Sequence, residues 1–278
     1  MITKDIYFNR IKREIKLKLK INVEQYKDSY INRRISVRMR ANNCKTYKDY
    51  YEYLIKNPNE YKKLENTLTV NVTEFWRDRT AYNEIEKILK NFVMDRKFKS
   101  LRIWSAGCSS GEEPYGIAII INELKYRYNR KFMPVSIIGT DLDSDILNKA
   151  KKGIYHNKQL KNIDNSLIYK YFTKLDEHQY EIKKDIKKYV KFKQHDLIRE
   201  PPLKGMNMIL CRNVIIYFDK QIQEELFLKF YDGLINGGYL ILGKTEILHG
   251  KARELFKAVN YRERIYKAKN INDKFYLN

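Results

Sequence analysis

The sequence predicts an α/β protein with three parts: an all-helical N-terminal domain, a parallel sheet covered by helices, and a small antiparallel β insertion. Three observations predict this. Apolar residues before residue 70 recur at helical spacing only, whereas from residue 101 onward strand patterns alternate with helical ones. The polar stretch 153–193 is in addition too long for a simple connection between two elements of a sheet.

The N-terminal domain is expected to be helical because stripes such as Ile31, Ile35 and Met39 keep the 3.6-residue period. The same segment carries four arginines, which we expect to lie opposite this stripe: Arg33, Arg34, Arg38 and Arg40. A guanidinium pairs a carboxylate in a bidentate fork. We therefore interpret the segment as a basic face that binds an acidic partner. The alternative is a basic face that is merely solvated.

The second domain shows strand patterns that alternate with helical segments. The strands are expected at 101–105, 135–140, 190–193, 206–210, 239–242 and 264–268, and the helices at 114–127, 145–151 and 221–235. This order is typical of a parallel α/β sheet. Ligands of such sheets bind outside the carboxyl ends of the strands, so polar residues at those ends are the candidates.

The loop after the first strand is the strongest local signal. Small residues fill positions 105–111, and the helix that follows begins with Glu112 and Glu113. The loop lacks the Lys-Ser/Thr of a phosphate-binding loop and the three-glycine spacing of a dinucleotide site. Two carboxylates suit a ligand with an ammonium, a sulfonium or ribose hydroxyls, which indicates S-adenosylmethionine (SAM). Asp141, at the end of the second strand, can accept hydrogen bonds from both ribose hydroxyls; the alternative is a helix cap.

The stretch 153–193 predicts a small β insertion on the main sheet. Residues 186–192 alternate as a strand does, and residues 180–182 are its candidate hairpin partner. Contact with a partner and a purely structural excursion are equally compatible with this pattern.

Composition narrows the classes of protein. The 278 residues include 56 Lys and Arg against 34 Asp and Glu, a net charge of +22, which attracts a negative partner. No apolar run approaches the roughly 20 residues that span a bilayer, and the N-terminus has no signal-peptide pattern. The three cysteines, Cys44, Cys108 and Cys211, form no CxxC pair, so we expect reduced thiols and no metal site. These features favour a cytoplasmic enzyme without membrane insertion, which we expect to be a monomer.

Five motifs then resemble one family. They are residues 71–77 (NVTEFWR), 109–115 (SSGEEPY), 139–143 (GTDLD), 211–218 (CRNVIIYF) and 237–243 (GGYLILG). In this order they resemble the chemotaxis receptor methyltransferases of the CheR family over nearly the whole chain. The resemblance implies a Rossmann-like SAM-dependent methyltransferase, with S-adenosylhomocysteine as product, that methylates glutamate side chains of methyl-accepting chemotaxis receptors.

The resemblance also implies a domain plan. Residues 1–70 are expected to form the receptor-recognition domain and residues 71–90 a linker that contributes to the SAM site. Residues 91–278 then form the methyltransferase domain, with the β insertion at about 154–190.

Cofactor residues carry over from the family position by position. Asn71, Thr73 and Arg77 are expected to close over the methionine end of SAM, with Arg77 on its carboxylate. Glu112 faces the ammonium, and Asp141 holds the ribose.

The remaining carried-over positions lie farther along the chain. Asp196 and Leu197 lie beside the adenine, where the family more often has Asn than Asp. Arg212 and Asn213 complete the pocket, and Tyr217 is the candidate for positioning on the substrate side. Residues 244–246 (KTE) also depart from the family pattern, although the acidic Glu246 is kept.

The implied chemistry needs no general base. A glutamate with a pKa near about 4.3 is already ionised at neutral pH. Orientation and exclusion of water therefore carry the rate, and no catalytic nucleophile or base is assigned.

Two other functions remain possible at this point. The net charge suggests an RNA methyltransferase, but the chain lacks an Asn/Asp-Pro-Pro-Tyr/Phe motif and a catalytic cysteine pair, so we expect no nucleic-acid partner. A non-catalytic adaptor is disfavoured because Arg77, Glu112, Asp141 and Asn213 are all intact.

The β insertion gives one further expectation. In some family members it binds a peptide from the receptor's C-terminus through a glycine-bearing loop. Residues 174–180 (KLDEHQY) contain no glycine, and Asp176 and Glu177 would repel an acidic peptide. We therefore predict that this enzyme does not depend on a receptor tail peptide.

Overall fold

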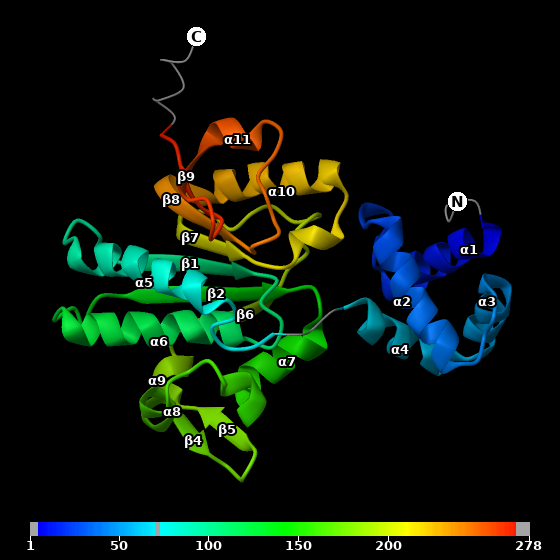
Figure 1. Ribbon diagram of the computed structural model, residues 1–278, viewed down its shortest axis with the longest axis horizontal. Helices are drawn as coiled ribbons and strands as arrows, with labels where there is room; N and C mark the ends of the chain where they lie inside the picture. The colour runs from blue at the N-terminus through cyan, green and yellow to red at the C-terminus, as the bar shows by residue number, and fades with distance from the viewer. Residues whose placement is uncertain (1–4, 70–72, 271–278) are drawn as a thin grey trace. The chain divides into compact units, whose positions relative to one another are not determined.

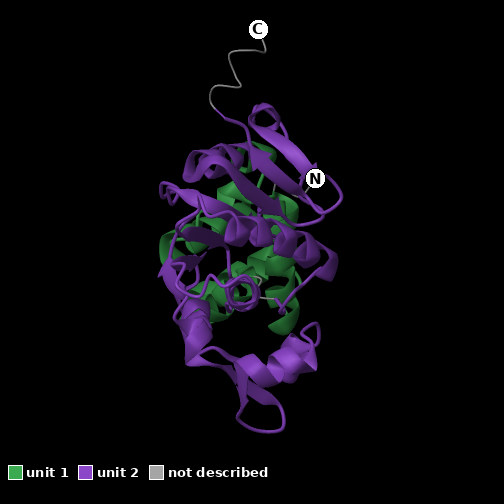
Figure 2. Cartoon of the chain, turned by 90° about the vertical axis from the view of Figure 1, so that its left-hand side faces the viewer, with its two compact units in different colours: residues 1–70, 216–223 green, residues 71–215, 224–278 purple. Residues whose placement is uncertain are grey.

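The computed structural model describes residues 5–69 and 73–270. The chain divides into two compact units, one of residues 1–70 with 216–223 and the other of residues 71–215 with 224–278 (Figure 2). Each unit has its own hydrophobic core.

The first unit is helical, as predicted. Its α-helices are α1 (Ile6–Glu14), α2 (Asp28–Ala41), α3 (Tyr47–Lys56) and α4 (Pro58–Leu68). Local signals set the starts of three of them. The Asp5 carboxylate accepts from the Tyr7 and Phe8 N–H groups before α1, Thr46 and Asp49 form a capping box at α3, and Pro58 occupies the first turn of α4. The helices pack around a core that includes Phe8, Ile11, Ile35, Tyr50 and Leu64.

A distant segment completes this first unit. The Lys27 amide N–H donates to the Tyr217 carbonyl at 3.0 Å, and Lys27 Nζ donates to the Ile216 carbonyl at 2.8 Å. The rings of Tyr30 and Tyr217 lie 4.6 Å apart, and Tyr26 forms an antiparallel bridge with Phe218. Tyr217 therefore packs on the start of α2, within the helical unit.

The second unit is built on a seven-stranded sheet (Figure 1). Its order is β6-β2-β1-β7-β8-β10-β9, with β1 (Leu101–Ala106), β2 (Val135–Asp141), β6 (Val190–Gln194), β7 (Met206–Cys211), β8 (Leu234–Leu242), β9 (Phe256–Asn260) and β10 (Ile265–Ala268). Every predicted strand is present. The sheet is mixed rather than wholly parallel, because β10 pairs antiparallel to β8 and to the unpredicted β9.

Helices cover both faces of this sheet (Figure 1). Helices α5 (Arg79–Met94) and α6 (Glu112–Arg127) pack together on one face. On the other face Phe230 of α10 (Lys220–Gly233) packs edge-on against Trp104 of β1. The remaining helices of this unit are α7 (Ser144–Lys152), α8 (Asn165–Tyr171), α9 (Lys184–Lys187) and α11 (Ala252–Leu255).

The insertion forms a separate three-stranded antiparallel sheet of order β3-β5-β4. Its strands are β3 (Ile154–His156), β4 (Phe172–Lys174) and β5 (Gln179–Ile182). The insertion was predicted, but the predicted hairpin is wrong: residues 180–182 pair with β3 and β4, whereas β6 pairs with β2 of the main sheet. The alternating residues 186–192 thus belong to two elements. The first two end helix α9 (Lys184–Lys187), and the last three begin β6, the edge strand of the main sheet.

The helices of residues 5–69 and 73–270 are all too short or too polar to span a lipid bilayer. The same residues contain no group of three or more His, Cys, Asp or Glu side chains arranged to hold a metal ion.

Candidate active site

The loop after β1 is held tightly at the carboxyl edge of the sheet. The Gly107 and Cys108 N–H groups both donate to the Thr140 carbonyl of β2 at 2.8 Å. Gly107 has φ +78°, and a Cβ there would come within 2.5 Å of Val214. Gly111 has φ +92° and directly precedes α6. Glycine is thus required at both positions because φ is positive, and at Gly107 also because the side chain of Val214, after β7, leaves no room for a Cβ.

Asp141 lies at the end of β2, as predicted. Its Oδ2 accepts from the Ser109 N–H at 2.9 Å and its Oδ1 from the Asp143 N–H at 3.1 Å. Asp143, not Asp141, caps α7, because its carboxylate accepts from the Asp145 and Ile146 N–H groups. A carboxylate offers about four acceptor positions. Asp141 therefore keeps acceptor capacity for ligand hydroxyls, and burial raises the pKa of its carboxyl.

Glu112, the first residue of α6, is fully buried at this edge. The Ser110 hydroxyl donates to it at 2.7 Å, and the Gln159 amide also donates to it. Burial raises the pKa of the Glu112 carboxyl against the hydrogen bonds from Ser110 and Gln159, which lower it. Both of these partners are neutral, so a cationic ligand group would gain more here than beside an exposed carboxylate.

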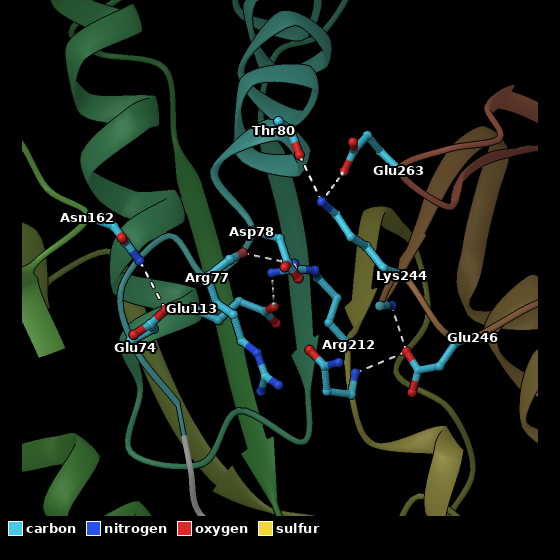
Figure 3. Close-up of polar contacts among 12 residues, drawn as sticks. Glu74, Arg77, Asp78, Thr80, Glu113, Asn162, Arg212, Lys244, Glu246 and Glu263 are labelled. Carbon is cyan, nitrogen blue, oxygen red and sulfur yellow. Dashed lines mark hydrogen bonds and ion pairs between the residues drawn. The ribbon is translucent and has the colours of Figure 1, made fainter.

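Arg212 follows β7 and ties three segments together (Figure 3). Its Nη2 donates to the Arg77 carbonyl at 2.9 Å and to Asp78 Oδ2 at 2.8 Å. Its Nη1 lies 3.7 Å from Glu113 Oε2, and its side chain is 3% exposed. The Arg212 guanidinium thus fixes the segment before α5 onto the end of β7. Figure 3 shows the Arg77 guanidinium pointing away from this cluster.

The segment before α5 is anchored at a second point. Asn162 Nδ2 donates to Glu74 Oε1 at 3.1 Å and to the Phe75 carbonyl at 3.2 Å. The Phe75 N–H donates to the Gln159 carbonyl at 3.0 Å. Gln159 therefore connects this segment with Glu112. Thr73 is partly buried here, and Asn71 lies outside the described residues.

Glu246 organises the loop after β7. Its buried carboxylate accepts from four backbone N–H groups at 2.6 to 3.0 Å: those of Asn213, Val214, Ile215 and Gly243. Asn213 has φ +61°, so this clamp holds it in a left-handed conformation. The sequence identified Glu246 only as a kept acidic position. Its role could not be predicted because its four partners are backbone N–H groups, which every residue type except proline has.

Asp196 and Leu197 follow β6, the strand next to β2. The His195 N–H donates to the Asp141 carbonyl at 3.0 Å, so this loop begins beside Asp141. Asp196 Oδ1 accepts from the Ile198 and Arg199 N–H groups at 2.9 and 3.1 Å. At the carboxyl edge, hydrogen bonds thus connect Asp141 with the loop after β1 and with the start of the loop after β6, and Arg212 with the segment before α5. Thr73, Arg77, Glu112, Asp141, Asp196, Leu197, Arg212 and Asn213 all belong to the second unit.

Comparison with known proteins identifies the family. The family described as CheR methyltransferase, SAM binding domain, matches residues 71–265, and CheR methyltransferase, all-alpha domain, matches residues 6–69. This chain belongs to the CheR methyltransferase family.

Curated relatives agree. A chemotaxis protein methyltransferase of Borreliella burgdorferi is 34% identical over 238 residues, which cover 83% of this chain and 84% of that protein. Chemotaxis protein methyltransferase 2 of Vibrio cholerae is 31% identical over 95% of this chain and 92% of its own. A chemotaxis protein methyltransferase of Listeria innocua is 31% identical, with 87% and 88% covered.

This CheR family member is therefore a SAM-dependent methyltransferase. The described residues fit the cofactor. Buried Glu112 has neutral partners and suits an ammonium, and Asp141 keeps acceptor capacity for hydroxyls.

The arginines of α2 differ from the prediction in one respect. Arg33 and Arg40 are exposed, but Arg38 forms a bidentate pair with buried Glu60, Nε to Oε1 at 2.8 Å and Nη2 to Oε2 at 2.9 Å. Arg34 is partly buried, with its guanidinium 5.2 Å from the Tyr30 ring centre. The expectation that all four lie opposite the apolar stripe is wrong, because Arg38 is seven residues after Ile31 and so returns to nearly the same face.

Proposed function

We propose that this enzyme transfers the methyl group of SAM to glutamate side-chain carboxylates of methyl-accepting chemotaxis receptors. The observation that carries the proposal is the pair of acids, Glu112 and Asp141, on either side of the loop after β1 in a chain of the CheR family. The names of the relatives add chemotaxis as the setting.

The site residues are assigned as follows. Asp141 accepts from the ribose hydroxyls, and Glu112 faces the ammonium. Thr73 and Arg77, with Asn71, close over the methionine end, and Arg77 pairs the cofactor carboxylate. Asp78 and Glu113 hold Arg212, so Arg212 contributes by fixing the Arg77 backbone.

The other assigned residues follow β6 and β7 in the chain. Asp196 and Leu197 bound the adenine side. Asn213, held by Glu246, completes the pocket wall. Tyr217 is the candidate for positioning the substrate.

The reaction asks mainly for orientation. When bound, SAM supplies a methyl group on a positively charged sulfur. The acceptor glutamate is ionised at neutral pH, so the chain need not remove a proton. The segment 73–78, anchored by Asn162 and Arg212, is suited to exclude water and hold the reacting groups.

Recognition of the receptor is assigned to the helical unit. Exposed Arg33 and Arg40, with Arg34, present guanidinium groups that suit a glutamate-rich helical surface. Arg38 is left out because Glu60 already occupies its fork. The partner is thus the cytoplasmic part of the receptor, and the enzyme acts as a cytoplasmic monomer.

Methyl transfer from radiolabelled SAM to receptor-containing membranes and to total RNA tests the proposal. We expect base-labile label on receptor protein and none on RNA. Arg33→Glu with Arg40→Glu should lower the rate about tenfold at low salt, with less effect at high salt. A matched reversal at exposed Lys48 and Lys63 of the same unit should leave the rate within about twofold. Label on RNA, or equal loss in both double variants, would contradict the proposal.

The β insertion is proposed not to bind a receptor tail peptide. Its β4–β5 turn is closed by Asp176, whose Oδ1 accepts from the His178 and Gln179 N–H groups at 2.7 Å. Titration with an acidic pentapeptide ending in a free carboxylate should show no micromolar binding. Binding that disappears when the β4–β5 turn is replaced would overturn this point.

A further inference from the structure

Lys229 of α10 makes an unusual set of contacts. Its Nζ donates to the backbone carbonyls of Leu197 at 3.3 Å and Glu200 at 3.0 Å, and also to that of Ile198. An ammonium group has three N–H donors. All three are therefore directed at one loop of the chain, and none of these three acceptors is a side chain.

Hydrogen bonds within residues 196–200 also stabilise this loop. Asp196 Oδ1 accepts from the Ile198 and Arg199 N–H groups, and Glu200 Oε1 accepts from the Asp196 N–H at 2.9 Å. The Glu200 N–H returns to the Asp196 carbonyl at 2.9 Å. Residues 196–200 thus form a compact turn, and Lys229 is its anchor to the body of the domain.

The turn lies where a base would lie. It follows β6, which pairs with β2 on the side away from β1. The His195 N–H reaches the Asp141 carbonyl, so the turn starts next to the residue assigned to the ribose. A nucleoside with its ribose on Asp141 and its sulfur arm toward the loop after β1 must direct its base toward this neighbouring strand end.

We propose that Lys229 is a positioning residue for nucleobase selection. Because three backbone carbonyls accept from its Nζ, Lys229 fixes the backbone of residues 196–200. The same hydrogen bonds orient these oxygens toward α10, so they do not contact the base. The purine then meets Asp196 and Leu197 in a single geometry. This inference rests on the proposed placement of the adenine and not on the identity of the methyl acceptor.

Calorimetric binding of S-adenosylhomocysteine and of its inosine analogue, in which an oxo group replaces the exocyclic amine, tests the proposal. Lys229→Met keeps the stem and removes the donors. We expect affinity for S-adenosylhomocysteine to fall about tenfold and the preference for adenine over hypoxanthine to shrink by a similar factor. The control Lys220→Met, an exposed lysine of the same helix, should change neither quantity.

Each other result overturns the proposal. Unchanged affinity and preference would show that the loop is fixed without Lys229. Lower affinity with an unchanged preference and a lower unfolding temperature would reduce Lys229 to general support. If Lys229→Met does not fold, Lys229→Arg keeps the proposal testable. Its guanidinium is larger and planar, so its donors lie in other positions than those of the ammonium group, and the preference for adenine over hypoxanthine should still become smaller. No methyl acceptor is present in these measurements, so their failure is distinct from failure of the glutamate proposal.

Discussion

Two buried glutamates, Glu60 in the helical unit and Glu112 in the second unit, have carboxyl pKa values shifted in opposite directions. Glu60 of the helical unit is 2% exposed and accepts from Arg38, Tyr50 and Asn42. Burial opposes its ionisation, but the hydrogen bonds from Arg38 and Tyr50 outweigh burial and lower the pKa of its carboxyl. Glu112 of the methyltransferase unit is fully buried and is bonded to Ser110 and Gln159, and burial raises its pKa.

A structural acid and a binding acid therefore differ in the source of their positive partner. The positive partner of Glu60 comes from its own unit, so its charge contributes to stability. Glu112 has the neutral partners Ser110 and Gln159, which is why we propose that the ammonium of the cofactor supplies its positive partner.

The largest effect should come from removing the positive partner of Glu60. Arg38→Met leaves a buried carboxylate without its ion pair and should lower the free energy of unfolding by about 3 kcal/mol. Chemical denaturation measures this loss. Arg40→Met, on the exposed side of the same helix, is the control and should change stability by less than about 0.5 kcal/mol. Equal losses of stability in the two variants would show that the Arg38 ion pair is not what stabilises Glu60.

Replacing each glutamate by glutamine should affect different properties, SAM affinity for Glu112 and stability for Glu60. Glu112→Gln should weaken SAM binding by about 2 kcal/mol, roughly 30-fold, because a charge-assisted contact is lost. It should leave the free energy of unfolding unchanged or higher at neutral pH, since a buried charge is removed. Glu60→Gln should do the reverse, lowering stability while SAM affinity stays within about twofold. Calorimetry and denaturation of both variants test the crossed result, and parallel effects would contradict it.

The pH dependence sharpens the same contrast with a smaller, graded effect. Burial raises the carboxyl pKa values of Glu112 and Asp141, so both bind protons earlier than ordinary acids as the pH falls. The proposed contacts of SAM with both acids need their ionised forms, so SAM affinity should decrease from neutral to mildly acid pH, with proton release on binding. Calorimetry in buffers of different ionisation enthalpy detects these protons, and Glu112→Gln should release fewer. Glu60, with its lowered pKa, should keep its stabilising charge until lower pH.

The smallest effect concerns a neutral partner of Glu60. The Tyr50 hydroxyl donates to Glu60 Oε1 at 3.0 Å. Tyr50→Phe removes this donor but leaves the Arg38 pair, so unfolding should lose only about 1 kcal/mol. A loss as large as that of Arg38→Met, measured by denaturation, would show that the hydroxyl and not the cation satisfies Glu60.

The sequence was most informative where a local pattern determines a position. The carboxyl ends of parallel strands share one edge, so the sequence alone could predict that Asp141, at the end of β2, lies near the loop after β1. Strand β9 was missed because its five residues carry no strong apolar pattern and no glycine or proline ends it. Helix α5 was missed for another reason: residues 71–90 were assigned to a linker, whereas 79–94 are helical.

Long-range pairing limited the prediction of individual residues. Arg38 meets Glu60 across 22 positions, and Arg212 meets Asp78 across 134. Local sequence spacing predicts neither pair. The helical period does, however, place Arg38 within about 20° of Ile31 around the axis of α2. An arginine beside an apolar stripe is better expected to have an internal partner than a ligand.

The junction around Lys27 has a consequence for how the protein is made. The helical unit leaves the ribosome first, yet Lys27 Nζ bonds to the Ile216 carbonyl, 189 positions later, and Tyr30 packs on Tyr217. During synthesis the start of α2 must therefore remain without these two contacts until most of the second unit has been translated. A fragment that stops at residue 70 would lack this closing segment, so its solubility and thermal stability should be lower than those of the same unit in the whole chain.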